Sequence, residues 1–123
     1  MTTGLPISVD ILLKGENDAT TVTLDGPPHT PTAWTDLDVR LVLEAMLRAM
    51  DRQKYPGEAA RTIALRGLSW IVNPFEDGGV VIAIEITLGA AVAGPFDIDK
   101  GRLETMMTRV LAAPVPPAST TIH

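Results

Sequence analysis

Twice along this chain, a pair of segments with alternating apolar residues is followed by an amphipathic helix. A period of two residues places every second side chain on one face of a strand, whereas a period near 3.6 marks one face of a helix. In chain order the strands and helices are expected at about 7–13, 20–24, 36–53, 61–72, 80–88 and 97–112. This order predicts a ββα unit that is used twice.

The two halves also share short sequence matches. Asp36-Leu37-Asp38 and Asp97-Ile98-Asp99 stand at corresponding places near the expected helix starts, and Met46 corresponds to Met107 at the same offset. Each expected strand has one apolar face, which a helix has to cover. We therefore expect an α+β fold in which an internal duplication gives a four-stranded antiparallel sheet, with two helices packed on one face.

Capping and turn residues refine these boundaries. Thr35 is expected to cap the first helix, with Asp38 at the reciprocal position of a capping box, and Asp97 is expected to cap the second helix. The alternation of the third strand changes phase at Arg66-Gly67, which predicts a β-bulge. The segment Gly89 to Phe96 is interpreted as a loop.

Composition limits the class of protein. The chain of 123 residues is expected to form a single domain over 1–112, with pseudo-repeats at about 5–55 and 60–112 and a Pro/Ser/Thr-rich tail over 113–123. It contains no cysteine, which excludes disulfides, thiolate catalysis and cysteine zinc sites and favours a cytoplasmic location.

Charge and hydropathy limit the partners. The net charge is −5 and no Lys/Arg cluster occurs, so nucleic acid and anionic membranes are not expected partners. No apolar run approaches the roughly 18 residues of a membrane span, and the first residues show no signal-peptide pattern. We expect a small acidic protein that works in the cytoplasm.

The sheet face that the helices leave open is expected to be neither a core nor a fully charged surface. Such a mixed face often packs against a second subunit, and homodimers are the commonest oligomers. The sequence therefore predicts a homodimer. The residues expected on this face are Ser8, Asp10, Leu12, Thr21, Thr23, Thr62, Ala64, Arg66, Val81, Ala83 and Glu85.

His29 is the candidate for acid–base chemistry. It lies in the proline-rich segment Gly26 to Pro31, and a histidine can act as a general base near neutral pH. Asp25, four residues earlier, is a candidate to orient it. The alternative interpretation is an exposed loop histidine without a function. No metal site is predicted, because a zinc site needs three or four protein ligands and no such spacing occurs.

The remaining candidates concern ligand binding. Arg66 and Glu85 are charged residues within strands that can pair across the open face or simply contact water. Trp34 precedes the first helix cap and is expected to pack against it, although it is also a candidate ligand contact, and Trp70 is expected in the core. The two Asp-X-Asp pairs resemble carboxylate dyads, but acidic residues at helix N-termini have a structural role that explains them.

The sequence therefore leaves the function open between three hypotheses. The first is a self-associating domain that binds a protein or a small molecule without catalysis and without a cofactor. The second is a small enzyme in which His29 acts as general acid or base in a pocket under the loop from Gly26 to Trp34. The third is an acidic adaptor whose proline-rich tail binds a partner.

Overall fold

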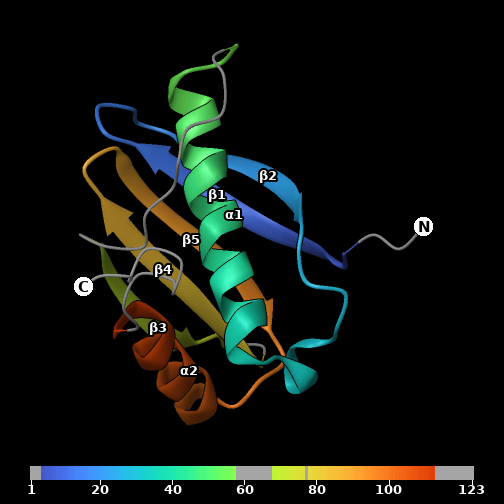
Figure 1. Ribbon diagram of the computed structural model, residues 1–123. Coiled ribbons are helices and arrows are strands. Elements are labelled where there is room, and N and C mark those ends of the chain that lie inside the picture. Colours follow the sequence, from blue (N-terminus) through green and yellow to red (C-terminus); the bar gives the residue numbers. More distant parts are fainter. Residues whose placement is uncertain (1–3, 58–67, 77, 113–123) are drawn as a thin grey trace, which may run out of the picture.

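The protein has an α+β fold in which one antiparallel sheet is covered on one face by two helices (Figure 1). The computed structural model describes residues 4–57, 68–76 and 78–112. The strands and helices are β1 (Pro6–Leu13), β2 (Thr20–Asp25), the 3-10 helix η1 (Pro31–Ala33), α1 (Asp36–Lys54), β3 (Ser69–Pro74), β4 (Val80–Ile86), β5 (Gly89–Phe96) and α2 (Lys100–Ala112). The five strands lie in the order β2-β1-β5-β4-β3.

The predicted duplication with a four-stranded sheet is wrong. The segment interpreted as a loop is β5, and it forms the centre of the sheet, where it pairs with β1 on one side and with β4 on the other. The order along the chain is therefore ββα followed by βββα, and the two halves are not equivalent. The predicted strand at 61–72 is described only from Leu68 onward, and Arg66-Gly67 lie outside the described residues.

The composition of β5 is that of a loop. The strand consists largely of glycine and alanine, which have low strand propensity. Ala91 and Ala93 are almost fully buried, and they face α1, which crosses the sheet over β1 and β5. Small side chains let the helix approach the sheet closely at this crossing. A β-bulge in the pairing of β4 with β5 accommodates Pro95, since proline cannot donate a ladder hydrogen bond.

The repeated acidic motif also has different roles in the two halves. Asp36 and Asp38 are the first and third residues of α1, where Asp38 completes the predicted capping box with Thr35. The second helix begins later than expected, at Lys100, and its cap is Asp99, whose Oδ2 accepts a hydrogen bond from the Arg102 N–H at 2.9 Å. The prediction that Asp97 caps this helix is therefore wrong.

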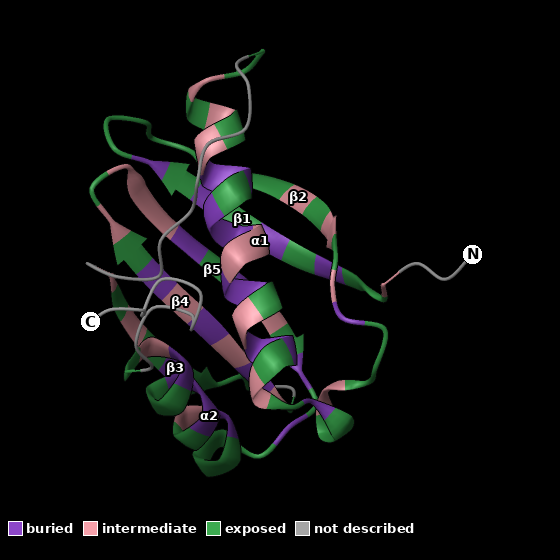
Figure 2. Cartoon of the chain, viewed as in Figure 1, coloured by how far each residue is buried: buried purple, intermediate pink, exposed green. Residues whose placement is uncertain are grey.

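The inward faces of β1 and β4 follow the predicted alternation. Ile7, Val9, Ile11 and Leu13 are buried in β1, and the apolar face of β4 is buried in the same way. Figure 2 shows that the buried residues lie where helices and sheet face each other. The open face carries Ser8, Asp10, Leu12, Thr21, Thr23, Val81, Ala83 and Glu85, as expected from their phase. Thr62, Ala64 and Arg66, the other residues predicted for this face, lie outside the described residues.

Two arginines of α2 connect it to the start of α1. Arg102 donates hydrogen bonds from its guanidinium to the carbonyl oxygens of Thr32 and Trp34, at 3.0 and 2.8 Å. Arg109 makes a bidentate pair with Asp36, with both N···O distances at 2.8 Å. The hydrogen bonds from Arg109 hold the pKa of Asp36 below its ordinary value of 3.8, although desolvation opposes the shift.

The capping box predicts the effect of a single substitution at the start of α1. We expect Thr35→Ala to lower the free energy of unfolding by about 1 kcal/mol, because the Asp38 N–H then loses its side-chain acceptor. Urea unfolding followed by circular dichroism measures this change. Thr32→Ala, on the exposed side of η1, is the control and should change stability by less than about 0.5 kcal/mol. Equal stabilities of the two variants would contradict the assignment of the cap.

The pair of Asp36 and Arg109 predicts a pH dependence. Because the pKa of Asp36 is lowered in the folded state, its contribution to stability is present above the ordinary pKa of 3.8 and is lost as the pH falls through the folded value. The stability difference between the unmodified protein and Asp36→Asn should therefore be constant near neutral pH and shrink below about pH 4. In an Arg109→Gln background this pH-dependent difference should disappear. Its persistence there would assign it to other groups.

Candidate functional site

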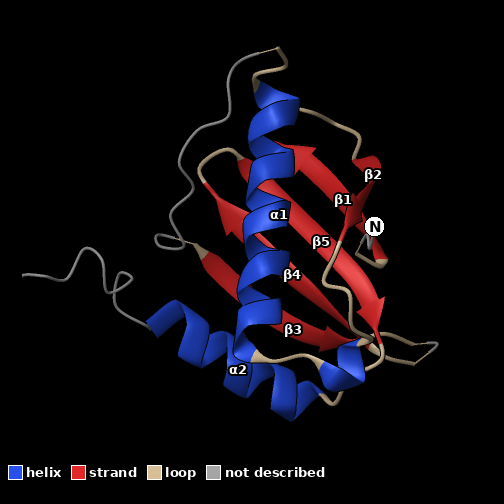
Figure 3. Cartoon of the chain, turned by 45° about the vertical axis from the view of Figure 1, so that its right-hand side comes forward, coloured by secondary structure: helices blue, strands red, loops and turns tan. Residues whose placement is uncertain are grey.

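A largely apolar pocket of about 410 Å³ lies at one end of the sheet. It is formed where the first residues of β1 and the last residues of β5 meet the proline-rich loop before α1 (Figure 3). Its lining consists mainly of proline, aromatic and aliphatic residues, with three polar side chains at its wall. The lining residues are Leu5, Pro6, Ile7, Ser8, Pro27, His29, Pro31, Trp34, Gly94, Pro95, Phe96 and Asp97.

Two aromatic side chains support the pocket from the core. Trp34 and Phe96 are only 2% and 4% exposed, and their ring centroids lie 4.8 Å apart with the planes tilted by 58°. The indole N–H of Trp34 donates a hydrogen bond to the carbonyl oxygen of His29 at 3.2 Å. Trp34 therefore fixes the main chain that carries His29, and most of its surface contacts protein. It positions the site more than it offers a broad ligand platform.

The loop keeps its shape through short-range hydrogen bonds and the prolines. Ala33 donates to the carbonyl oxygen of Thr30, and Trp34 donates to that of Pro31, which gives the single 3-10 turn of η1. Proline at the first position of such a turn has the required φ angle in advance. A loop that is fixed in this way can hold a side chain at a defined place against the sheet.

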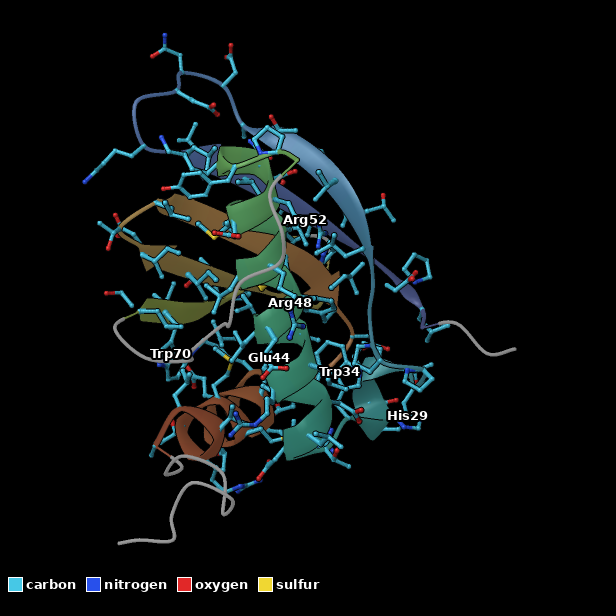
Figure 4. All side chains as sticks on the ribbon, turned by 45° about the horizontal axis from the view of Figure 1, so that its top comes forward. His29, Trp34, Glu44, Arg48, Arg52 and Trp70 are labelled. Atoms are coloured by element: carbon cyan, nitrogen blue, oxygen red, sulfur yellow. The ribbon has the colours of Figure 1, made fainter. Side chains whose placement is uncertain are left out.

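His29 lies beside a buried carboxylate that is not the predicted one. Its Nε2 is 4.0 Å from Oδ1 of Asp38, whose side chain is 6% exposed, while the imidazole itself is 53% exposed (Figure 4). The other oxygen of Asp38, Oδ2, accepts the Thr35 N–H at 2.9 Å. Asp38 thus uses one oxygen for the helix cap and turns the other toward His29.

The candidate partner Asp25 does not line this pocket. It ends β2, where it pairs with Pro6 in the sheet register. In the sequence, Asp38 is recognisable only as a capping residue, because nine residues separate it from His29 and no local pattern links them. The loop has to turn back onto the start of α1 before the two side chains meet, and only the tertiary structure shows that turn.

The other candidate residues lie elsewhere in the molecule. Glu85 is exposed on the open sheet face, opposite Ser69 in the pairing of β3 with β4. Arg66 lies outside the described residues, so its predicted pairing with Glu85 stays a prediction. Trp70 is half-buried on the helix-covered face and packs against the core, as expected.

A second hollow, of about 730 Å³, lies between the start of α1 and the side of α2 from Arg102 to Arg109, but it is more open to solvent. Its two arginines, Arg102 and Arg109, already bind main-chain carbonyls and Asp36. The polar groups of this hollow are therefore satisfied within the protein, and we take the pocket beside His29 as the candidate site.

Comparisons with known proteins did not identify a relative of this chain, so the function has to be inferred from the geometry of the pocket. A scan against protein-family models found no matching family, and searches of curated proteins and of solved structures found no significant match. Among the described residues, no helix combines the length and hydropathy needed to cross a membrane. The described part of the chain also holds no cluster of three or more His, Cys, Asp or Glu side chains placed to bind a metal ion.

Proposed function

We propose that this chain is a non-catalytic domain that binds a small, largely apolar molecule with one polar or cationic group in the pocket beside His29. The pocket itself carries this proposal. Small-molecule sites are concave, mostly apolar, about 300–1,000 Å³ in volume, and contain a few polar groups that orient the ligand. The pocket of about 410 Å³ has this size and this composition, with His29, Ser8 and Asp97 as its polar side chains.

The charges around the pocket select the class of ligand. Asp97 lines the pocket, and the buried carboxylate of Asp38 lies directly behind His29. Two carboxylates near an apolar cavity disfavour an anionic ligand and favour a neutral or cationic one. The imidazole of His29 offers a hydrogen bond at the wall, while the prolines and the exposed side chain of Leu5 contact the apolar body. A largely apolar, neutral or cationic molecule with one polar group fits these conditions.

The second candidate function is general acid–base catalysis by His29. The observation that favours it is that Oδ1 of the buried Asp38 lies 4.0 Å from His29 Nε2, which is longer than the hydrogen bond of about 2.6–3.2 Å by which a carboxylate orients a catalytic imidazole. Such contacts often shorten only when substrate binds. Three expectations from the sequence stay predictions: that the chain self-associates, that it binds a protein partner and that it lies in the cytoplasm.

The binding proposal is tested with three flat probes that differ in charge, namely indole, benzamidine and benzoate. We expect indole and benzamidine at millimolar concentration to shift the amide NMR signals of residues lining the pocket, including His29 and Asp97. Benzoate should shift them at least about tenfold less at equal concentration, because the nearby carboxylates repel it. Absence of shifts with all three probes, or shifts confined to other surfaces, would contradict the proposal.

Two substitutions at His29 separate binding from catalysis. His29→Ala should weaken binding of indole about three- to tenfold, whereas Thr32→Ala in the neighbouring turn is the matched control and should leave it unchanged. His29→Gln keeps a hydrogen-bonding side chain and should bind like the unmodified protein. Hydrolysis of a chromogenic ester that both His29→Gln and Asp38→Asn abolish, with binding retained, would favour the catalytic alternative.

A further inference from the structure

Among the described residues, one edge of the sheet carries no proline, lysine or bulge, which are devices that block strand pairing. β2 forms this edge, and its register with β1 continues over six residue pairs without a bulge. Its sequence, Thr20–Asp25, contains no proline and no lysine. Natural edge strands usually carry such residues or a bulge, because an exposed strand edge is a template for another strand. The opposite edge strand, β3, ends in Pro74.

The outer main-chain groups of β2 can be assigned from its neighbours. The Gly26 N–H donates to the Leu5 carbonyl at 2.7 Å, toward β1. Main-chain groups of an antiparallel strand point to alternate sides, so Leu24 and Val22 also face β1, while Thr21 and Thr23 face outward. Within the described residues, no strand pairs with this outer side.

A groove with a mixed lining runs beside this edge, on the helix-covered side; Val22, Leu24 and Ala49 are its apolar residues, and Glu16, Thr20, Arg52 and Gln53 are its polar ones. It has a volume of about 450 Å³ and lies between β2 and the end of α1, which does not cover the edge strand completely. Val22 and Leu24 are only half-buried there, and Ala49 of α1 also lines the groove. Arg52, labelled in Figure 4, lies near the end of α1 beside them. A strand added to β2 would place alternate side chains in this groove.

We propose that β2 pairs with the β2 of a second copy of this chain, antiparallel about a twofold axis at Val22 or Thr23. The strand is self-complementary in both registers. With the axis at Val22, Thr21 faces Thr23 of the second copy. With the axis at Thr23, Thr23 faces Thr23 of the second copy. Asp25 then faces Ala19 or Thr21, so like charges do not oppose each other, and paired threonines are favourable.

This pairing gives hydrogen-bond partners to the outward main-chain groups of β2 and brings apolar side chains of both copies together beside the groove. Val22 and Leu24 of each copy lie on the groove side in either register, because residues directly opposite each other share a face. The two sheets then join into one continuous sheet, with both helix layers on the same side. A symmetric pair closes on itself and leaves no free β2 edge, unlike an open chain of strands. The inference does not depend on the proposed ligand pocket.

The absence of cysteine allows a direct test by single-cysteine crosslinking. We expect Val22→Cys or Thr23→Cys to form a disulfide-linked dimer under mild oxidation. Opposed residues of an antiparallel pair lie about 4.5–5.5 Å apart at Cα, which suits a disulfide. Val92→Cys, in the centre of the open sheet face, and Ile71→Cys on β3 are exposed controls and should stay monomeric on denaturing gels. Crosslinking of the controls but not of the β2 variants would overturn the proposal.

A proline substitution provides a second, independent test. Thr23→Pro removes the outward N–H of β2 but leaves the bonds toward β1, so the fold should persist while the dimer dissociation constant rises at least about tenfold. Thr23→Val keeps the N–H and a β-branched side chain, so it should raise the dissociation constant much less than Thr23→Pro does. Sedimentation equilibrium up to millimolar protein measures both. The proposal is overturned if the unmodified protein is a monomer, or if it forms a dimer whose dissociation constant Thr23→Pro does not change. If Thr23→Pro does not fold, the cysteine crosslinking experiment decides between dimer and monomer.

Discussion

The close packing of α1 over the centre of the sheet determines the arrangement of the other elements. The helix crosses β1 and β5, where Ala91 and Ala93 are almost fully buried beneath it. Larger side chains at these positions would push the helix away from the sheet, since protein interiors have little free volume. With α1 fixed over the centre, α2 covers β3, and β2 is left at an edge that α1 covers only in part.

The start of α1 is fixed by contacts that also build the candidate site. Asp38 completes the helix cap with one carboxylate oxygen and faces His29 with the other, while Trp34 holds the main chain of His29 from below. Arg102 from the second helix binds the carbonyl oxygens at the same turn. Because these contacts order the loop before any ligand arrives, binding in the pocket would cost little conformational entropy.

The pocket and the β2 edge are separate features with different physical origins. The pocket arises where a proline-rich loop closes over the end of the sheet, and its polar groups lie at its wall. The β2 edge exposes main-chain donors and acceptors, beside a groove that α1 does not fill. A ligand domain and a self-pairing surface can therefore coexist on one small chain, since neither uses the residues of the other.

Local patterns in the sequence determined the first two strands, the apolar face of β4 and the extent of α1, because periodicity acts over a few residues. They also determined the capping box of Thr35 and Asp38, because capping involves residues only three positions apart. They misjudged β5, since glycine and alanine indicate a loop unless a helix crosses directly above them. The sequence also drew attention to His29 and Trp34 but named Asp25 as the partner of His29. Only the tertiary structure placed β5 at the centre of the sheet and Asp38 beside His29, because both depend on contacts between segments that no local pattern connects.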